Sequence, residues 1–117
     1  MRPLLYVAAP YTLPEPVHNL HGVCRVAMEI YERTEWCPIV PHLSLVWQAV
    51  TPRGYDHWIE YDLHIMRQCQ AVVRLPGHSP GADGEVEEAK RLGIRILSLD
   101  ELPAEALKHW HIQNPLA

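Results

Sequence analysis

The sequence is poor in positive charge and in long apolar runs, and each shortage excludes a class of protein. Ten lysines and arginines stand against fourteen aspartates and glutamates, which gives a formal net charge of -4. A protein that wraps a nucleic acid polymer usually needs a basic face, so we expect no such partner. No segment approaches the roughly 18 apolar residues of a membrane span, and the short apolar run near the N-terminus is better interpreted as a strand than as a signal peptide.

Cysteine is also scarce, and the polar residues form no familiar metal or triad motif. Cys24, Cys37 and Cys69 form no CxxC pair and each stands in an apolar run, so we expect buried free thiols in the reducing cytoplasm. The eight histidines include two closely spaced pairs, but neither has a cysteine or carboxylate at ligand spacing. No metal, no cofactor and no GxSxG nucleophile are therefore predicted.

The apolar pattern divides the chain into alternating strands and helices. Continuous apolar runs predict buried strands, and helical spacing of apolar residues predicts helices. The expected strands are 3–10, 37–42, 70–76 and 94–99. The expected helices are 17–33, 43–50, 55–69, 80–92 and 100–113. This order predicts one α/β domain over residues 1–117, a three-layer sandwich of flavodoxin-like layout with a mostly parallel sheet of four or five strands.

Ligands of such sheets bind beyond the carboxyl ends of the strands, which directs attention to three loops. These loops span residues 9–16, 41–55 and 76–81. These loops contribute the candidate substrate-binding residues Pro10, Trp47, Ser79 and Gly81, and Ala82 directly follows the last of them. Ser79 before a proline is a good helix N-cap, and the amides that follow it can bind an anion at the helix N-terminus.

Two carboxylates stand on the apolar sides of their helices. Glu85 falls within the apolar arc of the helix expected at 80–92, and Asp62 lies one turn from Trp58 and Met66. A carboxylate that faces the sheet must be paired, protonated or functional, because burying it unpaired is costly. Each acid can instead be structural, as a helix cap, an ion-pair partner or an edge residue. Two inward carboxylates in different environments are also the usual equipment of glycosyl chemistry.

These residues resemble a known family. Tyr6 in "YVAAPY", Asp62 in "YDLHIMRQCQAVV" and the stretch "SPGADGEVEEA" together are similar to the nucleoside 2-deoxyribosyltransferases and their relatives, the 2'-deoxynucleoside 5'-monophosphate N-glycosidases. In the last stretch, Gly81, Glu85 and Ala89 match the spacing of glycine, nucleophilic glutamate and alanine. The resemblance covers roughly residues 4–96.

The resemblance implies a role for each matching residue. Glu85 would attack C1' of the sugar, Asp62 would protonate the departing base, and Tyr6 would orient the glutamate. Ser79 stands six residues before the nucleophile, where the monophosphate hydrolases have a serine near the 5'-phosphate. The implied activity is hydrolysis of the N-glycosidic bond of a nucleoside 5'-monophosphate, and Trp47 or Tyr11 could stack on the base.

Other functions stay open from the sequence alone. A base-exchanging deoxyribosyltransferase, a non-catalytic nucleotide-binding module and a structural oligomer without a ligand all agree with the same pattern. The expected partner is a small nucleoside or nucleotide. The modest core and the family both point to a homo-oligomer, in which Asn114 could complete the site of a neighbouring copy, as an asparagine does in the transferases.

Overall fold

The sheet has the expected layered α/β architecture. The structure is a computed structural model that describes residues 1–12 and 16–114; residues 13–15, within the first expected loop, and residues 115–117 lie outside it. The four strands of the described chain are β1 (Leu4–Ala8), β2 (Cys37–Ile39), β3 (Ala71–Arg74) and β4 (Arg95–Leu97). They form one sheet in the order β2-β1-β3-β4, and every neighbouring pair is parallel.

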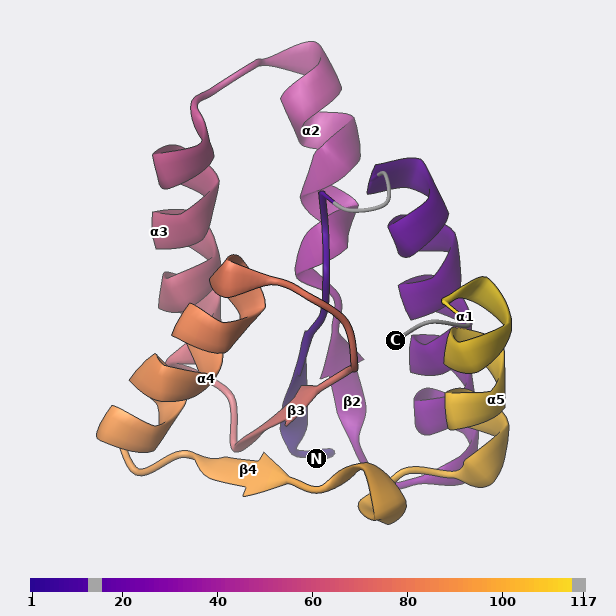
Figure 1. Ribbon diagram of the computed structural model, residues 1–117. Coiled ribbons are helices and arrows are strands. Elements are labelled where there is room, and N and C mark those ends of the chain that lie inside the picture. The colour runs from indigo at the N-terminus through magenta and orange to yellow at the C-terminus, as the bar shows by residue number, and fades with distance from the viewer. Residues whose placement is uncertain (13–15, 115–117) are drawn as a thin grey trace.

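Helices cover both faces of this sheet (Figure 1). The five α-helices of the described chain are α1 (Pro16–Arg33), α2 (Ser44–Val50), α3 (Tyr55–Met66), α4 (Pro80–Arg91) and α5 (Ala104–Gln113). The helices α1 and α5 lie side by side on one face, whereas α3 and α4 lie on the other (Figure 1). None of the described helices combines the length and the apolar character needed to cross a membrane.

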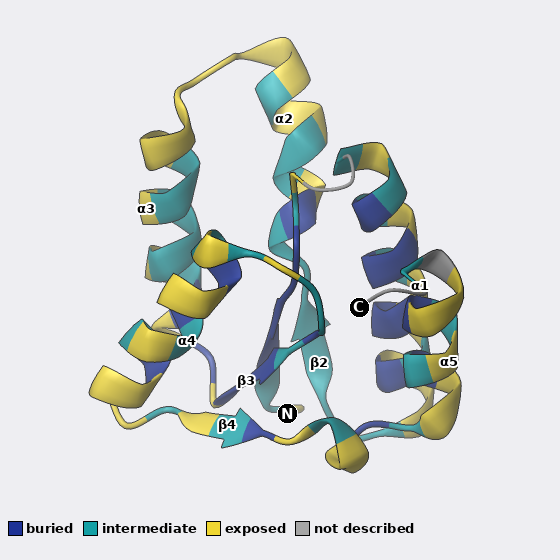
Figure 2. Ribbon diagram, viewed as in Figure 1, coloured by how far each residue is buried: buried dark blue, intermediate teal, exposed yellow. Residues whose placement is uncertain are grey.

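The strand β1 contributes side chains to both faces of the sheet, because successive side chains of a strand point in opposite directions. Leu5 and Val7 join the apolar cluster under α1 and α5, and Tyr6 and Ala8 join the cluster under α3 and α4. All four side chains are fully buried, as the dark ribbon of β1 shows in Figure 2. A strand buried on both faces explains the continuous apolar run in the sequence.

Three expectations need correction. The last helix begins at Ala104 rather than near residue 100, because Pro103 keeps the preceding Leu102 extended and residues 99–101 form a separate 3-10 turn. Only Cys69 is buried, whereas Cys24 and Cys37 are partly exposed; all three thiols are free. The apolar pattern of the helix expected at 80–92 also predicts an inward Leu92, but α4 ends at Arg91 and Leu92, its C-cap residue, is exposed.

Candidate active site

A cavity of about 380 Å³ lies where the strand order changes direction. Its wall includes Ala9, directly after the central strand β1, and His78, from the loop that follows the other central strand, β3. This is the point at which open α/β sheets bind ligands, since the connections leave β1 and β3 toward opposite edges. The cavity is lined by Ala9, Tyr11, Thr12, Pro41, His42, Ser44, Tyr55, Trp58, Ile59, Asp62, His78, Ser79, Pro80, Gly81, Ala82 and Glu85.

Glu85 reaches this cavity from the buried side of α4. It shares that side with Ala82 and Ala89, three residues before it and four after it, and only 8% of its surface is exposed. The Tyr6 hydroxyl donates a hydrogen bond to Oε2 of Glu85. Burial raises the pKa of Glu85 to about 7, although the Tyr6 hydrogen bond and the Arg74 charge both favour the ionised form.

Asp62 reaches the same cavity from α3, and its surroundings differ. Burial, followed by the nearby charge of Glu85, raises the pKa of Asp62 to about 7. Its Oδ1 is buried without a hydrogen-bond partner among the described residues. Because Glu85 has a hydroxyl donor and a cation to support a negative charge, we assign the charge of the pair to Glu85 and the proton to Asp62.

Tyr6 stands behind the carboxyl pair rather than in the cavity wall. Its side chain is fully buried, and burial together with the two acids raises its pKa well above the ordinary range. The phenol therefore keeps its proton and acts as a permanent donor. It fixes one oxygen of Glu85 and so limits the rotation of the carboxyl.

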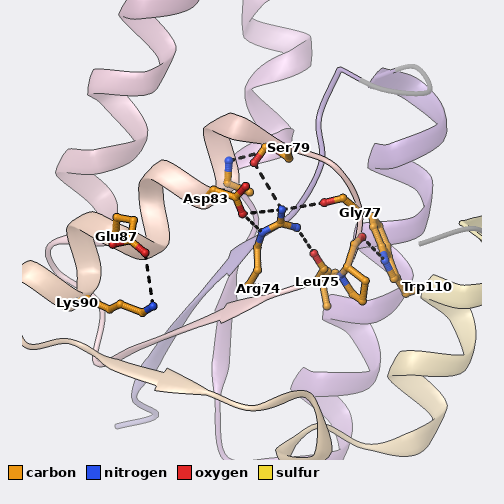
Figure 3. A network of polar contacts seen from close by, with 10 residues as sticks. Arg74, Leu75, Gly77, Ser79, Asp83, Glu87, Lys90 and Trp110 are labelled. Carbon is orange, nitrogen blue, oxygen red and sulfur yellow. Dashed lines mark hydrogen bonds and ion pairs between the residues drawn. The ribbon is translucent and has the colours of Figure 1, made fainter.

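The loop between β3 and α4 is held from two sides (Figure 3). The Arg74 guanidinium donates to the carbonyl oxygens of Leu75 and Gly77, and it pairs with Asp83 at 2.9 Å. From α5, the Trp110 indole donates to the Pro76 carbonyl at 3.0 Å. These bonds fix the loop that carries the next residues of the site.

Ser79 starts α4 as the sequence predicts. Its hydroxyl oxygen accepts from the Ala82 amide at 3.1 Å, which is an N-cap bond. Gly81 has little space for a side chain, since an added Cβ would lie 2.6 Å from the Tyr55 hydroxyl oxygen. Ser79, Gly81 and Ala82 all line the cavity, and so does Tyr55.

The other candidate binding residues lie outside the cavity wall. Pro10 is buried beside it, and its carbonyl bonds to a histidine of the wall. Trp47 is half-exposed on α2 and packs edge-on against Trp58 and Tyr61. Asn114 caps α5, and so belongs to the helix layer on the opposite face of the sheet.

Sequence reasoning missed His42, His78 and Arg74. His42 was one histidine among eight, and nothing in its neighbourhood predicted that it would be buried at the cavity. Arg74 carried a weak signal, as the single charge in the apolar run at 70–76.

No lysine or arginine is among the residues that line the cavity, and the described chain contains no group of three histidine, cysteine or acidic side chains that could hold a metal ion. The arrangement instead places the two carboxyl residues Asp62 and Glu85 beside an aromatic wall. Comparison with protein-family models and with curated protein sequences finds no match to the chain.

Proposed function

We propose that the protein hydrolyses the N-glycosidic bond of a nucleoside 5'-monophosphate through a covalent glutamyl-sugar intermediate. One observation carries this proposal: the carboxyls of Glu85 and Asp62 come from two different helices, line one cavity and differ in what supports their charge. A charged carboxylate opposite a protonated carboxyl is the pair that a retaining glycosidase requires.

In the first step, a Glu85 oxygen attacks C1' of the sugar. The C1'–N bond breaks, its electron pair leaves with the base, and Asp62 gives its proton to the base nitrogen. The product is an ester between Glu85 and the sugar. The Tyr6 hydroxyl holds the other glutamate oxygen and keeps the carboxyl in one orientation.

In the second step, water attacks C1' from the side that the base has left. Asp62, now ionised, takes the proton from this water, and the ester bond to Glu85 breaks. The free sugar phosphate leaves, and both carboxyls return to their starting states. The reaction consumes one water and needs no redox or metal partner to balance.

The rest of the cavity suits a nucleotide. Tyr11, Trp58 and Tyr55 give the wall aromatic surface for a planar base. The 5'-phosphate is assigned to the N-terminus of α4, where the Ser79 hydroxyl and the positive end of the helix dipole attract an anion.

Two other functions use the same residues. A deoxyribosyltransferase would pass the sugar from Glu85 to a second base instead of water. Among the described residues the cavity lining has no lysine or arginine, which favours the uncharged nucleoside that such an enzyme takes. A nucleotide-binding module would occupy the cavity without cleaving the bond. The proposal also includes a cytoplasmic homo-oligomer, with Asn114 of one copy near the site of another; light scattering of the purified chain measures its oligomeric state.

The decisive experiment is incubation with nucleoside 5'-monophosphates in ribo and deoxy forms, followed by chromatography of the free base. Hydrolysis releases base and sugar phosphate in equal amounts. A transferase forms a new nucleoside when a second base is added. Release of no base by the wild type, together with nucleotide binding that Glu85→Gln does not change, would favour the binding module.

A further inference from the structure

Two residues of the cavity wall each have a buried polar atom with no hydrogen-bond partner within the described chain. One is Asp62 Oδ1, which belongs to the proposed acid. The other is Nδ1 of His42, a residue of the 3-10 turn at Pro41–Leu43 that is only 4% exposed and lines the same cavity. A buried polar atom without a partner is costly and rare, and both of these atoms belong to residues that line the cavity a ligand would fill.

The chemical form of His42 follows from its other ring nitrogen. Nε2 lies 2.8 Å from the Pro10 carbonyl oxygen, which can only accept, so Nε2 carries the proton. Burial lowers the pKa of His42, and the ring is therefore neutral near pH 7. In this tautomer Nδ1 has no proton and is an acceptor.

The ring is also fixed in place. The Tyr11 ring packs edge-on against it, with centroids 5.5 Å apart and an interplanar angle of 88°. The Tyr11 carbonyl accepts from the Asn19 side chain at 2.9 Å, which ties this part of the wall to α1. His42 thus presents one acceptor in one orientation, and turning the ring over would break its bond to Pro10.

We propose that His42 is a specificity-determining residue that selects bases with an amino group over bases with a carbonyl oxygen at the position meeting Nδ1. The inference rests on the proposed function, in which the cavity holds the base. Adenine and cytosine carry an exocyclic amino donor where hypoxanthine and uracil carry an acceptor oxygen. An amino group satisfies Nδ1, whereas a carbonyl oxygen places two lone pairs against each other and leaves both unpaired.

The test is calorimetric titration of the full chain with four free bases, as the matched pairs adenine and hypoxanthine, and cytosine and uracil. The wild type should bind the amino member of each pair about tenfold more tightly. His42→Gln keeps an amide donor near the Nε2 position but has no acceptor at the Nδ1 position. We expect this variant to reduce the difference within each pair to about twofold or less. His78→Gln, at an exposed histidine of the same cavity, should keep the wild-type preference.

Equal affinities within each pair for the wild type would overturn the inference, and so would a preference that His42→Gln leaves intact or His78→Gln removes. Absence of binding for all four bases would overturn it as well. If His42→Gln does not fold, the affinities of the wild type for the two pairs of bases decide whether the inference holds. Titration with free bases requires no chemistry, so its outcome is separate from that of the proposed reaction. Selective binding without base release contradicts the proposed function only, whereas equal kcat/KM for AMP and IMP contradicts the inference only.

Discussion

The two faces of the sheet are built from the same strands but differ in the side chains that they bury. Under α1 and α5, large apolar side chains form one buried cluster against the sheet, and the fully buried Trp110 belongs to it. Under α3 and α4, the buried side chains are mostly smaller, and two acids and a cavity stand where further apolar residues could have packed. Figure 2 shows the contrast, since α1 is dark along one side and α3 is mostly intermediate or exposed.

This division explains how a chain of this length stays stable although it buries two acids. Burying carboxyls whose pKa is raised reduces stability, and a small domain has only a few kcal/mol in reserve. The apolar face offsets that cost. We therefore expect substitutions on the face under α3 and α4 to change mainly activity, and substitutions on the face under α1 and α5 to change mainly stability.

The largest effect is expected on the polar face, from Glu85→Gln. If Glu85 is the nucleophile, as proposed, this variant should release base roughly 10⁴-fold more slowly than wild type. Its stability should be unchanged or higher, because a neutral amide of the same shape can still accept from Tyr6 and buries no charge. Base release and urea unfolding measure the two quantities.

The matched control for this change is Glu87→Gln. Glu87 lies two residues away on the exposed side of α4, where it pairs with Lys90 at 3.5 Å. Such a surface pair contributes little, so both activity and stability should stay near wild type. Equal losses of activity in the two variants would remove Glu85 from the mechanism.

The next effect is expected on the apolar face, from Trp110→Ala. Removing this fully buried side chain should lower the free energy of unfolding by about 3–5 kcal/mol. Trp110→Phe keeps most of the packing and loses the bond to the Pro76 carbonyl, at a cost of about 1 kcal/mol. A loss below about 1 kcal/mol for the alanine variant would contradict the division between the faces.

A third effect is the pH dependence of stability. Burial raises the pKa of both Glu85 and Asp62 to about 7, above the values of the unfolded chain, so the folded chain binds more protons between about pH 4 and pH 7. Their contribution to stability is therefore full below about pH 4 and is lost as the pH rises to about 7. The difference between wild type and the double variant Glu85→Gln, Asp62→Asn should shift by up to roughly 3 kcal/mol for each acid over this range, and by less than the sum because the two acids interact and Asp62 is partly screened by solvent.

Urea unfolding at several pH values measures this difference, and a difference independent of pH would contradict the burial of the acids. The proposed mechanism needs Glu85 ionised and Asp62 protonated, so base release should be fastest near pH 7 and slower on both sides. Asp62→Asn should lower base release by roughly 10²-fold and remove the decline on the alkaline side, because its amide has no proton to lose.

The contrast between the faces was partly readable in the sequence. Helical spacing fixes which side of α4 a residue occupies, so the inward position of Glu85 followed from the apolar arc of that helix. The continuous apolar run of β1 likewise gave a strand buried on both faces. These predictions succeeded because they depend on local periodicity only.

What stayed hidden depends on contacts between distant parts of the chain. His42 is buried because its ring meets the carbonyl of Pro10, 32 residues earlier. The Trp110 indole bonds to the carbonyl of Pro76, 34 residues earlier, and no local sequence pattern predicts either bond. The position of Trp47 on the outer side of a short helix was equally unpredictable, since α2 has no buried residue to set its orientation.

The smallest effects concern Ser79, at the entrance to the polar face. Ser79→Ala removes the cap bond to the Ala82 amide and should lower stability by about 1 kcal/mol.

Ser79→Asp should keep that stability, because aspartate also caps a helix and its charge suits the N-terminal end of the dipole. Its charge would nevertheless repel a 5'-phosphate bound there. We expect kcat/KM for nucleoside monophosphates to fall about tenfold in the aspartate variant and that for nucleosides to stay near wild type. Comparison of the two substrate classes checks this, and an equal loss for both would place Ser79 near the sugar instead of the phosphate.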